Sequence, residues 1–221
     1  MKLLFQALTK FLAGALFVGL LLFLPAGTFD FPGAWLFLGL LFVPMLILGT
    51  VLLVKSPELL EKRLRHREKE STQRGVVAVT GVAFIASFIL AGLDHRFHWT
   101  EIPAWLTVTA SVLLLLSYAM YAEVMRENAY LSRTVEVQEN QSVVSTGLYG
   151  IVRHPMYAAT VVLFLAIPLV LGSWIAFVVM LVYPVGIAVR ILNEEAVLTE
   201  GLESYAEYKT KVKWRLIPFV W

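Results

Sequence analysis

The sequence predicts an all-α, polytopic membrane protein with about six transmembrane helices. Of the 221 residues, 59% are hydrophobic and 15% are charged, whereas soluble domains are about 45–50% apolar and about 25% charged. A net charge of +2 provides no overall field to attract nucleic acid, so none is expected as a partner. The lipid bilayer is the expected partner, and the absence of cysteine excludes disulfides and thiolate metal sites.

Apolar segments of about 20 residues, the length that spans the hydrocarbon core, recur along the chain. Four of them occupy residues 4–24, 34–54, 76–93 and 103–121. A longer run over residues 158–189 is interrupted by Pro168 and by Gly172-Ser173. At about 1.5 Å per residue, each half of this run is roughly 20–25 Å long, so we expect a tight helical hairpin. Pro184 should kink its second arm, because proline removes a helical hydrogen bond.

Basic residues cluster in alternate loops and therefore predict the orientation. Between the second and third spans lie Lys55, Lys62, Arg63, Arg65, Arg67, Lys69 and Arg74. Between the fourth and fifth spans lie Arg126, Arg133 and Arg153. The tail contains Lys209, Lys211, Lys213 and Arg215. Such residues accumulate on the cytoplasmic side, so we expect both termini, and the polar residues that flank the last apolar run, to lie there. Ser56-Pro57 is a typical helix start and predicts a basic interfacial helix at about residues 56–70, for which substrate steering is the alternative role.

Two polar clusters flank the last apolar run, and they divide the chain into N-terminal transmembrane helices over 1–125 and a C-terminal region over 126–221 that contains both clusters. Ionisable groups at the edge of the bilayer are costly unless they meet a partner or a ligand. The first cluster is Arg153-His154-Pro155-Met156-Tyr157. Pro155 is favoured in the first turn of a helix, and as the residue before a proline His154 is disfavoured from helical backbone angles. The free N–H groups of that turn can bind an anion. The alternative is that Arg153 snorkels to headgroups while His154 bonds the backbone.

The second cluster places Glu194 and Glu195 after Arg190, at the end of a membrane span. Two adjacent acids at a helix C-terminus oppose its dipole, so a partner or ligand is expected. The alternative is that Asn193 caps a new helix whose first turn contains both acids.

Tyr205 and Tyr208 lie three residues apart on an expected cytoplasmic interfacial helix. They could wall a nucleoside pocket, or they could belong to an aromatic belt at the membrane surface. On the opposite face, the segment from Asp94 to His98 has irregular spacing of its candidate ligands, so no metal site is expected. His66 is expected to be a solvated residue of the basic helix.

The motifs Gly147-x-Tyr149-x-x-Val152-Arg153-His154-Pro155-x-Tyr157 and Arg190-x-x-x-Glu194-Glu195-x-x-Leu198 together resemble a known family. It is the family of membrane methyltransferases that includes isoprenylcysteine carboxyl methyltransferase and phospholipid N-methyltransferase. Tyr205-x-x-Tyr208 and Arg215-Leu216-Ile217-Pro218 resemble the C-terminal end of the family's sequences. The resemblance therefore covers the chain from about Asn128 onward. Leu148 stands where relatives often have proline. The resemblance implies methyl transfer from S-adenosylmethionine, with S-adenosylhomocysteine as the product.

The resemblance also implies that residues 126–221 form a cofactor-binding catalytic region, with the active site on the cytoplasmic side, and it implies the site residues. The cofactor-binding residues would be Tyr149, Arg153, His154, Pro155, Tyr157, Glu194, Glu195, Tyr205 and Tyr208. The catalytic residues would be Arg153, His154, Arg190 and Glu194. Either glutamate could hold the cofactor's ammonium, and Arg153 or His154 its carboxylate. Arg190 would orient a carboxylate acceptor, whereas a thiol or an amine would need a base such as His154.

The expected acceptor is hydrophobic or prenylated, and an isoprenylcysteine-like carboxylate is favoured over a small thiol or a phospholipid amine. An NADPH-dependent membrane sterol-type reductase is an alternative, because those enzymes have a similar Arg-His-Pro turn. A transporter or scaffold is a third possibility, but transport requires polar groups at mid-membrane depth, and the first four spans have almost no ionisable residues at their centres.

Overall fold

The computed structural model describes residues 2–64, 71–128 and 142–221, and in these ranges it is helical without strands. The elements are α1 (Lys2–Ala26), α2 (Pro32–Lys55), α3 (Pro57–Leu64), α4 (Ser71–Phe97), α5 (Ala104–Glu127), the short 3-10 helix η1 (Gly147–Gly150), α6 (Pro155–Leu171), α7 (Trp174–Met180), α8 (Val182–Gly201) and α9 (Glu203–Lys211). The all-α prediction is confirmed.

Among the described residues, five helical segments are long and apolar enough to cross a membrane: Leu3–Ala26, Pro32–Lys55, Gly75–Phe97, Ala104–Glu127 and Trp174–Gly201. The sixth apolar helix, α6, has 17 residues, which is about 25 Å of helix against a hydrocarbon core of about 30 Å. The prediction of a multi-pass membrane protein is confirmed.

The last apolar run forms a helical hairpin that turns at Gly172. This residue has φ +86°, in the left-handed region that glycine adopts without strain. The Ser173 hydroxyl then caps α7 by accepting the N–H of Ala176 at 3.1 Å. The predicted interruption at Pro168 is wrong. Pro168 lies in the last turn of α6, where its carbonyl accepts the N–H of Ser173 at 3.0 Å.

The second arm of the hairpin is divided into α7 and α8 at Leu181. Pro184 explains the break, because it has no N–H to donate to the carbonyl of Met180 four residues earlier. The distortion expected at Pro184 therefore lies one turn earlier in the chain.

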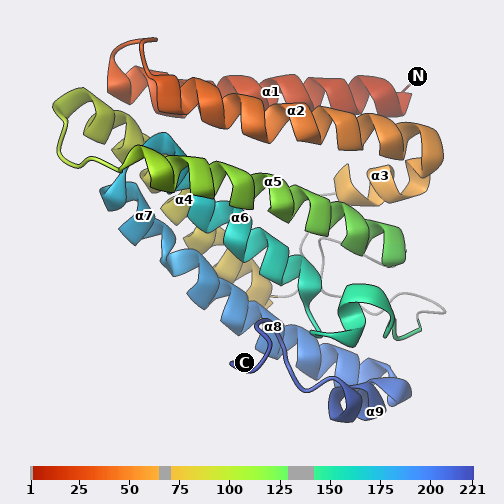
Figure 1. Ribbon diagram of the computed structural model, residues 1–221. Coiled ribbons are helices and arrows are strands. Elements are labelled where there is room, and N and C mark those ends of the chain that lie inside the picture. The colour runs from red at the N-terminus through yellow and green to blue at the C-terminus, as the bar shows by residue number, and fades with distance from the viewer. Residues whose placement is uncertain (1, 65–70, 129–141) are drawn as a thin grey trace.

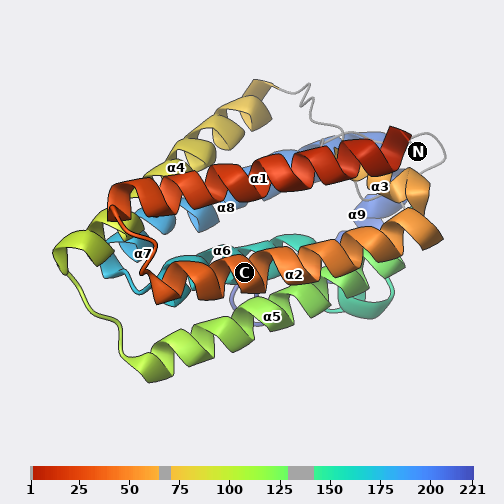
Figure 2. The ribbon, with the colours of Figure 1, turned by 90° about the horizontal axis from the view of Figure 1, so that it is seen from above.

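Figure 1 shows α1 and α2 side by side along one edge of the bundle, with α5 and α6 paired below them. Helix α4 packs against α1, α7 and α8, and in Figure 2 it crosses under α1. Helix α6 occupies the centre and contacts α2, α4, α5, α7 and α8. The approach of α4 to α1 requires Gly92, because a Cβ there would lie 2.6 Å from the carbonyl oxygen of Leu22.

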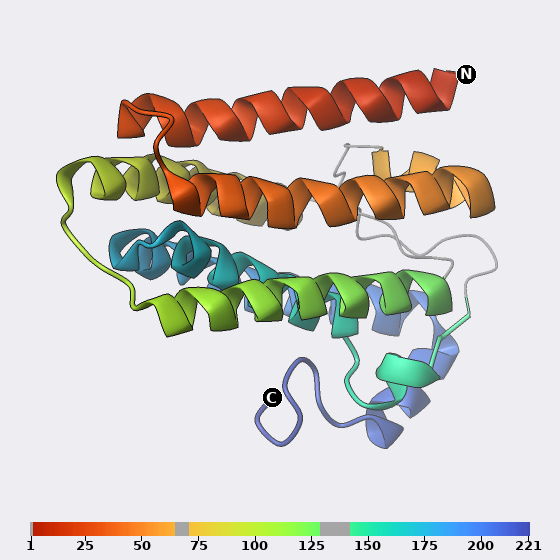
Figure 3. The ribbon, with the colours of Figure 1, turned by 45° about the horizontal axis from the view of Figure 1, so that its top comes forward.

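One end of the bundle contains α3, η1, α9 and the C-terminal ends of α5 and α8 (Figure 3). Helix α3 begins after Ser56, where the interfacial helix was expected, and Leu60 is buried. The expected continuation of that helix to residue 70, including His66, lies outside the described residues.

At the opposite end, Asp94 joins two loops. Its carboxylate accepts the N–H of Thr100 at 2.7 Å and the hydroxyls of Thr100 and Ser173 at 2.5 Å each. His95 Nε2 lies 2.8 Å from the carbonyl oxygen of Asp30. Within the described ranges, no group of three or more His, Cys, Asp or Glu residues could hold a metal ion. The polar residues at this end therefore connect the loops.

We expect Asp94→Ala to lower the free energy of unfolding by about 3 kcal/mol, since it removes the acceptor of the buried Ser173 hydroxyl and of two half-buried donors on Thr100. Thermal unfolding in detergent measures this effect, and Glu101→Ala, at an exposed side chain in the same loop, is the matched control. Equal melting temperatures for the two variants would contradict the role of Asp94.

Candidate active site

Arg153 and His154 lie between η1 and α6 and are buried. Pro155 at the first position of α6 keeps His154 out of the helix, at φ −125° and ψ 61°. The N–H groups of Arg153 and His154 consequently turn away from α6 and donate to the carbonyls of Trp214 and Arg215, both at 2.9 Å. The entrance of α6 is thereby bonded to the tail of the chain.

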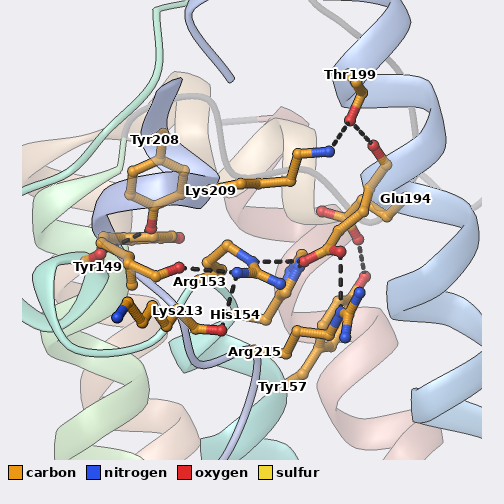
Figure 4. Close-up of polar contacts among 12 residues, drawn as sticks. Tyr149, Arg153, His154, Tyr157, Glu194, Thr199, Tyr208, Lys209, Lys213 and Arg215 are labelled. Carbon is orange, nitrogen blue, oxygen red and sulfur yellow. Dashed lines mark hydrogen bonds and ion pairs between the residues drawn. The ribbon is translucent and has the colours of Figure 1, made fainter. Parts of the chain in front are cut away.

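Glu195 near the end of α8 connects this segment to the tail. Figure 4 shows Arg153, His154 and Arg215, which surround its carboxylate, close to one another. Its Oε1 accepts from Arg153 Nε at 2.7 Å and lies 3.2 Å from His154 Nε2, while its Oε2 accepts from Arg215 Nε at 2.9 Å. Arg153 Nη1 also donates to the carbonyls of Val212 and Lys213, at 2.8 and 3.1 Å. Buried charges are stable only when they are paired and hydrogen-bonded, and here both oxygens of the carboxylate have cationic donors.

Glu194 has different partners from its neighbour. Its Oε2 accepts the hydroxyl of Tyr157 at 2.5 Å, and Arg190 Nε donates to the same hydroxyl at 2.9 Å. The His154 ring stacks on the Tyr157 ring, with centroids 5.7 Å apart. The two adjacent acids thus belong to two connected networks, which explains how both are accommodated at the end of an apolar helix.

Two of the alternatives considered for these residues are wrong. Asn193 does not cap a new helix, because α8 continues without a break from Val182 to Gly201. Arg153 does not extend to headgroups, because its side chain is 6% exposed and is bonded to Glu195.

Helix α9 lies over the Arg153–Glu195 network and contributes Tyr205 and Tyr208, whose ring centroids are 5.7 Å apart. Both side chains are buried, so a membrane-surface belt does not describe them. Tyr208 donates its hydroxyl to the carbonyl of Tyr149 at 2.7 Å, and the hydroxyl of Tyr149 accepts from Asn128 Nδ2 at 2.9 Å. Burial raises the pKa of both Tyr205 and Tyr208 well above the usual 10.0, so their hydroxyls stay protonated at physiological pH.

The Tyr205 hydroxyl is buried and, within the described part of the chain, has no hydrogen-bond partner. It is close enough to Arg153, Glu194 and Glu195 to interact with their charges. An unsatisfied buried hydroxyl is costly, so its position beside this cluster suits a polar ligand.

The structure brings the sequence-predicted site residues to one end of the bundle, and Pro155 contributes as the first residue of α6. Sequence reasoning missed the role of Arg215, which pairs with Glu195, and of Thr199, which donates to the carbonyl of Glu195 at 2.5 Å. The available signal for Arg215 was its place in the Arg215-Leu216-Ile217-Pro218 motif, which the sequence shares with the family it resembles. Thr199 had no such signal, because threonine is common on helices.

Residues 105–204 match the family model for phospholipid methyltransferases. The fold resembles the solved structure of a eukaryotic intramembrane Ras methyltransferase, isoprenylcysteine carboxyl methyltransferase, with a TM-score of 0.56 and 19% sequence identity. That comparison covers 92% of this chain and 74% of the other. No curated protein matches the chain in sequence. The matched region contains the Arg153 and Glu194-Glu195 segments, and over these residues the chain is similar to the phospholipid methyltransferases.

Proposed function

We propose that this protein transfers a methyl group from S-adenosylmethionine to a hydrophobic acceptor, and that the acceptor is an isoprenylcysteine-like carboxylate. The reaction would take place in the region 126–221, on the cytoplasmic side. The observation that carries the proposal is the network of Arg153, His154, Glu194 and Glu195 beneath α9, in which all but the half-buried Glu194 are buried, inside the region that matches the family model. The acceptor is inferred from the solved relative, whose name describes a carboxyl methyltransferase.

The residues present fit S-adenosylmethionine. The unsatisfied hydroxyl of Tyr205 offers a hydrogen bond to a polar ligand, and the rings of Tyr205 and Tyr208 offer apolar walls to its nucleoside. The carboxylates of the network can pair with the ammonium of the cofactor's amino acid moiety, and its cationic groups can pair with the carboxylate of that moiety. Because both oxygens of Glu195 accept from arginines, we assign the ammonium to Glu194 and the carboxylate to His154 and the Arg153 side of the network. Glu195 then positions Arg153 and His154.

When bound, S-adenosylmethionine supplies an electrophilic methyl group on its sulfonium. The protein's contribution is alignment and exclusion of water, which together provide much of the acceleration of a direct displacement. Tyr157 fixes the guanidinium of Arg190 through its hydroxyl, and Arg190 would orient the acceptor carboxylate. A carboxylate is already a nucleophile, so no base is needed. A thiol or amine acceptor would require one, and His154 is the candidate.

Binding of radiolabelled S-adenosylmethionine and of NADPH to the purified protein tests this proposal. We expect saturable binding of S-adenosylmethionine and, with an acceptor panel of farnesylcysteine analogues, phosphatidylethanolamine and small thiols, a base-labile methyl ester on the farnesylcysteine analogue. Binding of NADPH alone would support the reductase instead. Methylation of the lipid amine or of a thiol would retain the methyltransferase and replace the acceptor.

Transport fits the structure poorly. The buried ionisable side chains of the described residues are Asp94, Arg153, His154 and Glu195. Asp94 lies at one end of the bundle and the other three at the opposite end, whereas transporters place such groups near the midplane.

We expect Tyr205→Phe to weaken binding of S-adenosylmethionine about tenfold while leaving the melting temperature of the ligand-free protein unchanged or higher. The substitution removes a hydroxyl that is unsatisfied without ligand and bonded with it. Calorimetric titration and thermal unfolding measure the two effects.

The matched control is Tyr208→Phe, which removes the hydrogen bond to Tyr149 and should lower the melting temperature. A loss of stability in Tyr205→Phe, with affinity unchanged, would contradict the assignment of Tyr205 to the ligand.

A further inference from the structure

The tail that follows α9 turns back along the bundle (Figure 1). Leu216 is buried in a cluster with Met180, Tyr183, Ile187 and Ile191, and Trp221 packs against the same cluster. These partners belong to the membrane-compatible segment Trp174–Gly201. The tail therefore lies beside an apolar part of the bundle.

The tip of this tail, residues 217–220, presents apolar side chains outward. Ile217 is 50% exposed, Phe219 86% and Val220 73%. Phe219 has φ +65°, a left-handed conformation that large side chains rarely adopt. The Phe219 ring lies 5.5 Å from the Trp214 ring, centroid to centroid, and most of its surface stays exposed. An apolar environment favours such an exposed phenyl ring.

Most backbone N–H groups of the tip have partners within the tail. The N–H groups of Arg215, Leu216 and Ile217 converge on the main-chain oxygen of Trp221, at 2.9, 2.9 and 3.2 Å, and those of Val220 and Trp221 both reach the carbonyl of Ile217 at 3.1 Å. Pro218 has no N–H group. In contact with lipid, an unpaired backbone donor is costly, and internal pairing of this kind removes most of that cost.

The charges around the tip also favour a membrane surface. Residues 209–221 contain Lys209, Lys211, Lys213 and Arg215 and no acidic residue. Basic residues beside an apolar tip suit the boundary between anionic headgroups and acyl chains.

We propose that residues 217–220 insert into the interfacial region of the bilayer and anchor the tail over the Arg153–Glu195 network. The tail carries the groups that bond this network, namely Arg215 and the carbonyls of Val212, Lys213 and Trp214. Contact of the tip with lipid thus holds the cover of the site in place. The anchor is independent of which ligand the site binds.

Site-specific fluorescence in liposomes tests the insertion, and the absence of native cysteine makes single labels unambiguous. We would label Phe219→Cys with an environment-sensitive fluorophore, using Val185→Cys, at a 65% exposed position of α8, as the lipid-facing reference. Glu207→Cys, on the exposed face of α9 where the side chain is 69% exposed, is the aqueous reference. We expect the label at 219 to be quenched by lipids with brominated acyl chains, as at 185, and protected from aqueous iodide, unlike at 207.

Iodide quenching at 219 equal to that at 207 would overturn the proposal. Protection from both quenchers would overturn it as well, because a second copy or another protein would then cover the tip. If Phe219→Cys fails to fold, Val220→Cys replaces it, since both side chains project from the same turn. Neither measurement requires methyl transfer, so this result and the outcome of the cofactor-binding test can be told apart.

Hydrogen exchange of the peptide containing Arg153 and His154 tests the anchoring, because the N–H groups of both residues donate to tail carbonyls. In liposomes, we expect about tenfold faster exchange in Phe219→Asp than in Phe219→Leu, which keeps the apolar contact. Equal exchange rates in the two variants would show that the tip does not hold the tail.

Discussion

Glu195→Ala is expected to abolish binding of S-adenosylmethionine and to lower the free energy of unfolding by about 3–5 kcal/mol. The carboxylate accepts from Arg153 and Arg215 at 2.7 and 2.9 Å, and Arg153 is buried. Removing it leaves the Arg153 charge unpaired in the interior, which is the costliest way to break an ion pair. The tail would also lose its bond through Arg215. Thermal unfolding and binding of the radiolabelled cofactor measure the two effects.

Two further variants serve as controls for Glu195→Ala. Glu200→Ala removes an exposed carboxylate from the same helix and should leave both measurements within error of the wild type. Glu195→Gln retains an acceptor oxygen without the charge, so its melting temperature should lie between those of the alanine variant and the wild type. If Glu195→Ala bound the cofactor with wild-type affinity and unfolded at the wild-type temperature, the central role of this carboxylate would be refuted.

Arg153→Lys is expected to reduce kcat/KM about 100-fold although it preserves the positive charge. Arg153 donates from Nε to Glu195 and from Nη1 to the carbonyls of Val212 and Lys213. The planar guanidinium reaches these acceptors in different directions, whereas a lysine ammonium is a single point on a flexible chain. Both the start of α6 and the tail would lose their alignment. Steady-state methylation of a farnesylcysteine analogue measures the effect.

Arg126→Lys is the matched control for this substitution. Arg126 lies near the end of α5, its side chain is 69% exposed, and it pairs with Glu123 at 2.7 Å. Exposed pairs contribute at most about 1 kcal/mol, so activity should remain at the wild-type level. Equal activity of Arg153→Lys and Arg126→Lys would show that charge alone, and not the geometry of the guanidinium, is required at position 153.

Several elements could be predicted from the sequence because local physics determines them. Hydropathy located the first four membrane-compatible helices to within a few residues of α1, α2, α4 and α5. Pro155 and Gly172 marked the start and the end of α6, since proline and glycine restrict or permit particular backbone angles regardless of distant contacts. Pro168 misled the prediction, because a proline near the end of a helix costs too little to break it when the helix packs against several neighbours, as α6 does against α2, α4, α5, α7 and α8.

The candidate site is less accessible to such reasoning. The sequence drew attention to the Arg153 and Glu194-Glu195 segments, because ionisable residues at the edge of an apolar run need partners. It left open which acidic side chain pairs with which basic one, and it did not predict that Arg215 pairs with Glu195. Glu194 and Glu195 are adjacent in the chain, yet one binds Tyr157 and the other binds Arg153 and Arg215.

By itself, the sequence determined the helical class, the membrane-compatible segments and the two polar segments that flank the last hairpin, since each of these depends on neighbouring residues. Only the tertiary structure decided that Arg153 and Glu195, 42 positions apart, form a buried pair, that Arg215 completes it, and that the tail returns along α8. The physical reason is that a buried charge is stabilised by whichever opposite charge the packed helices bring within hydrogen-bond distance, and that choice is made by the whole bundle.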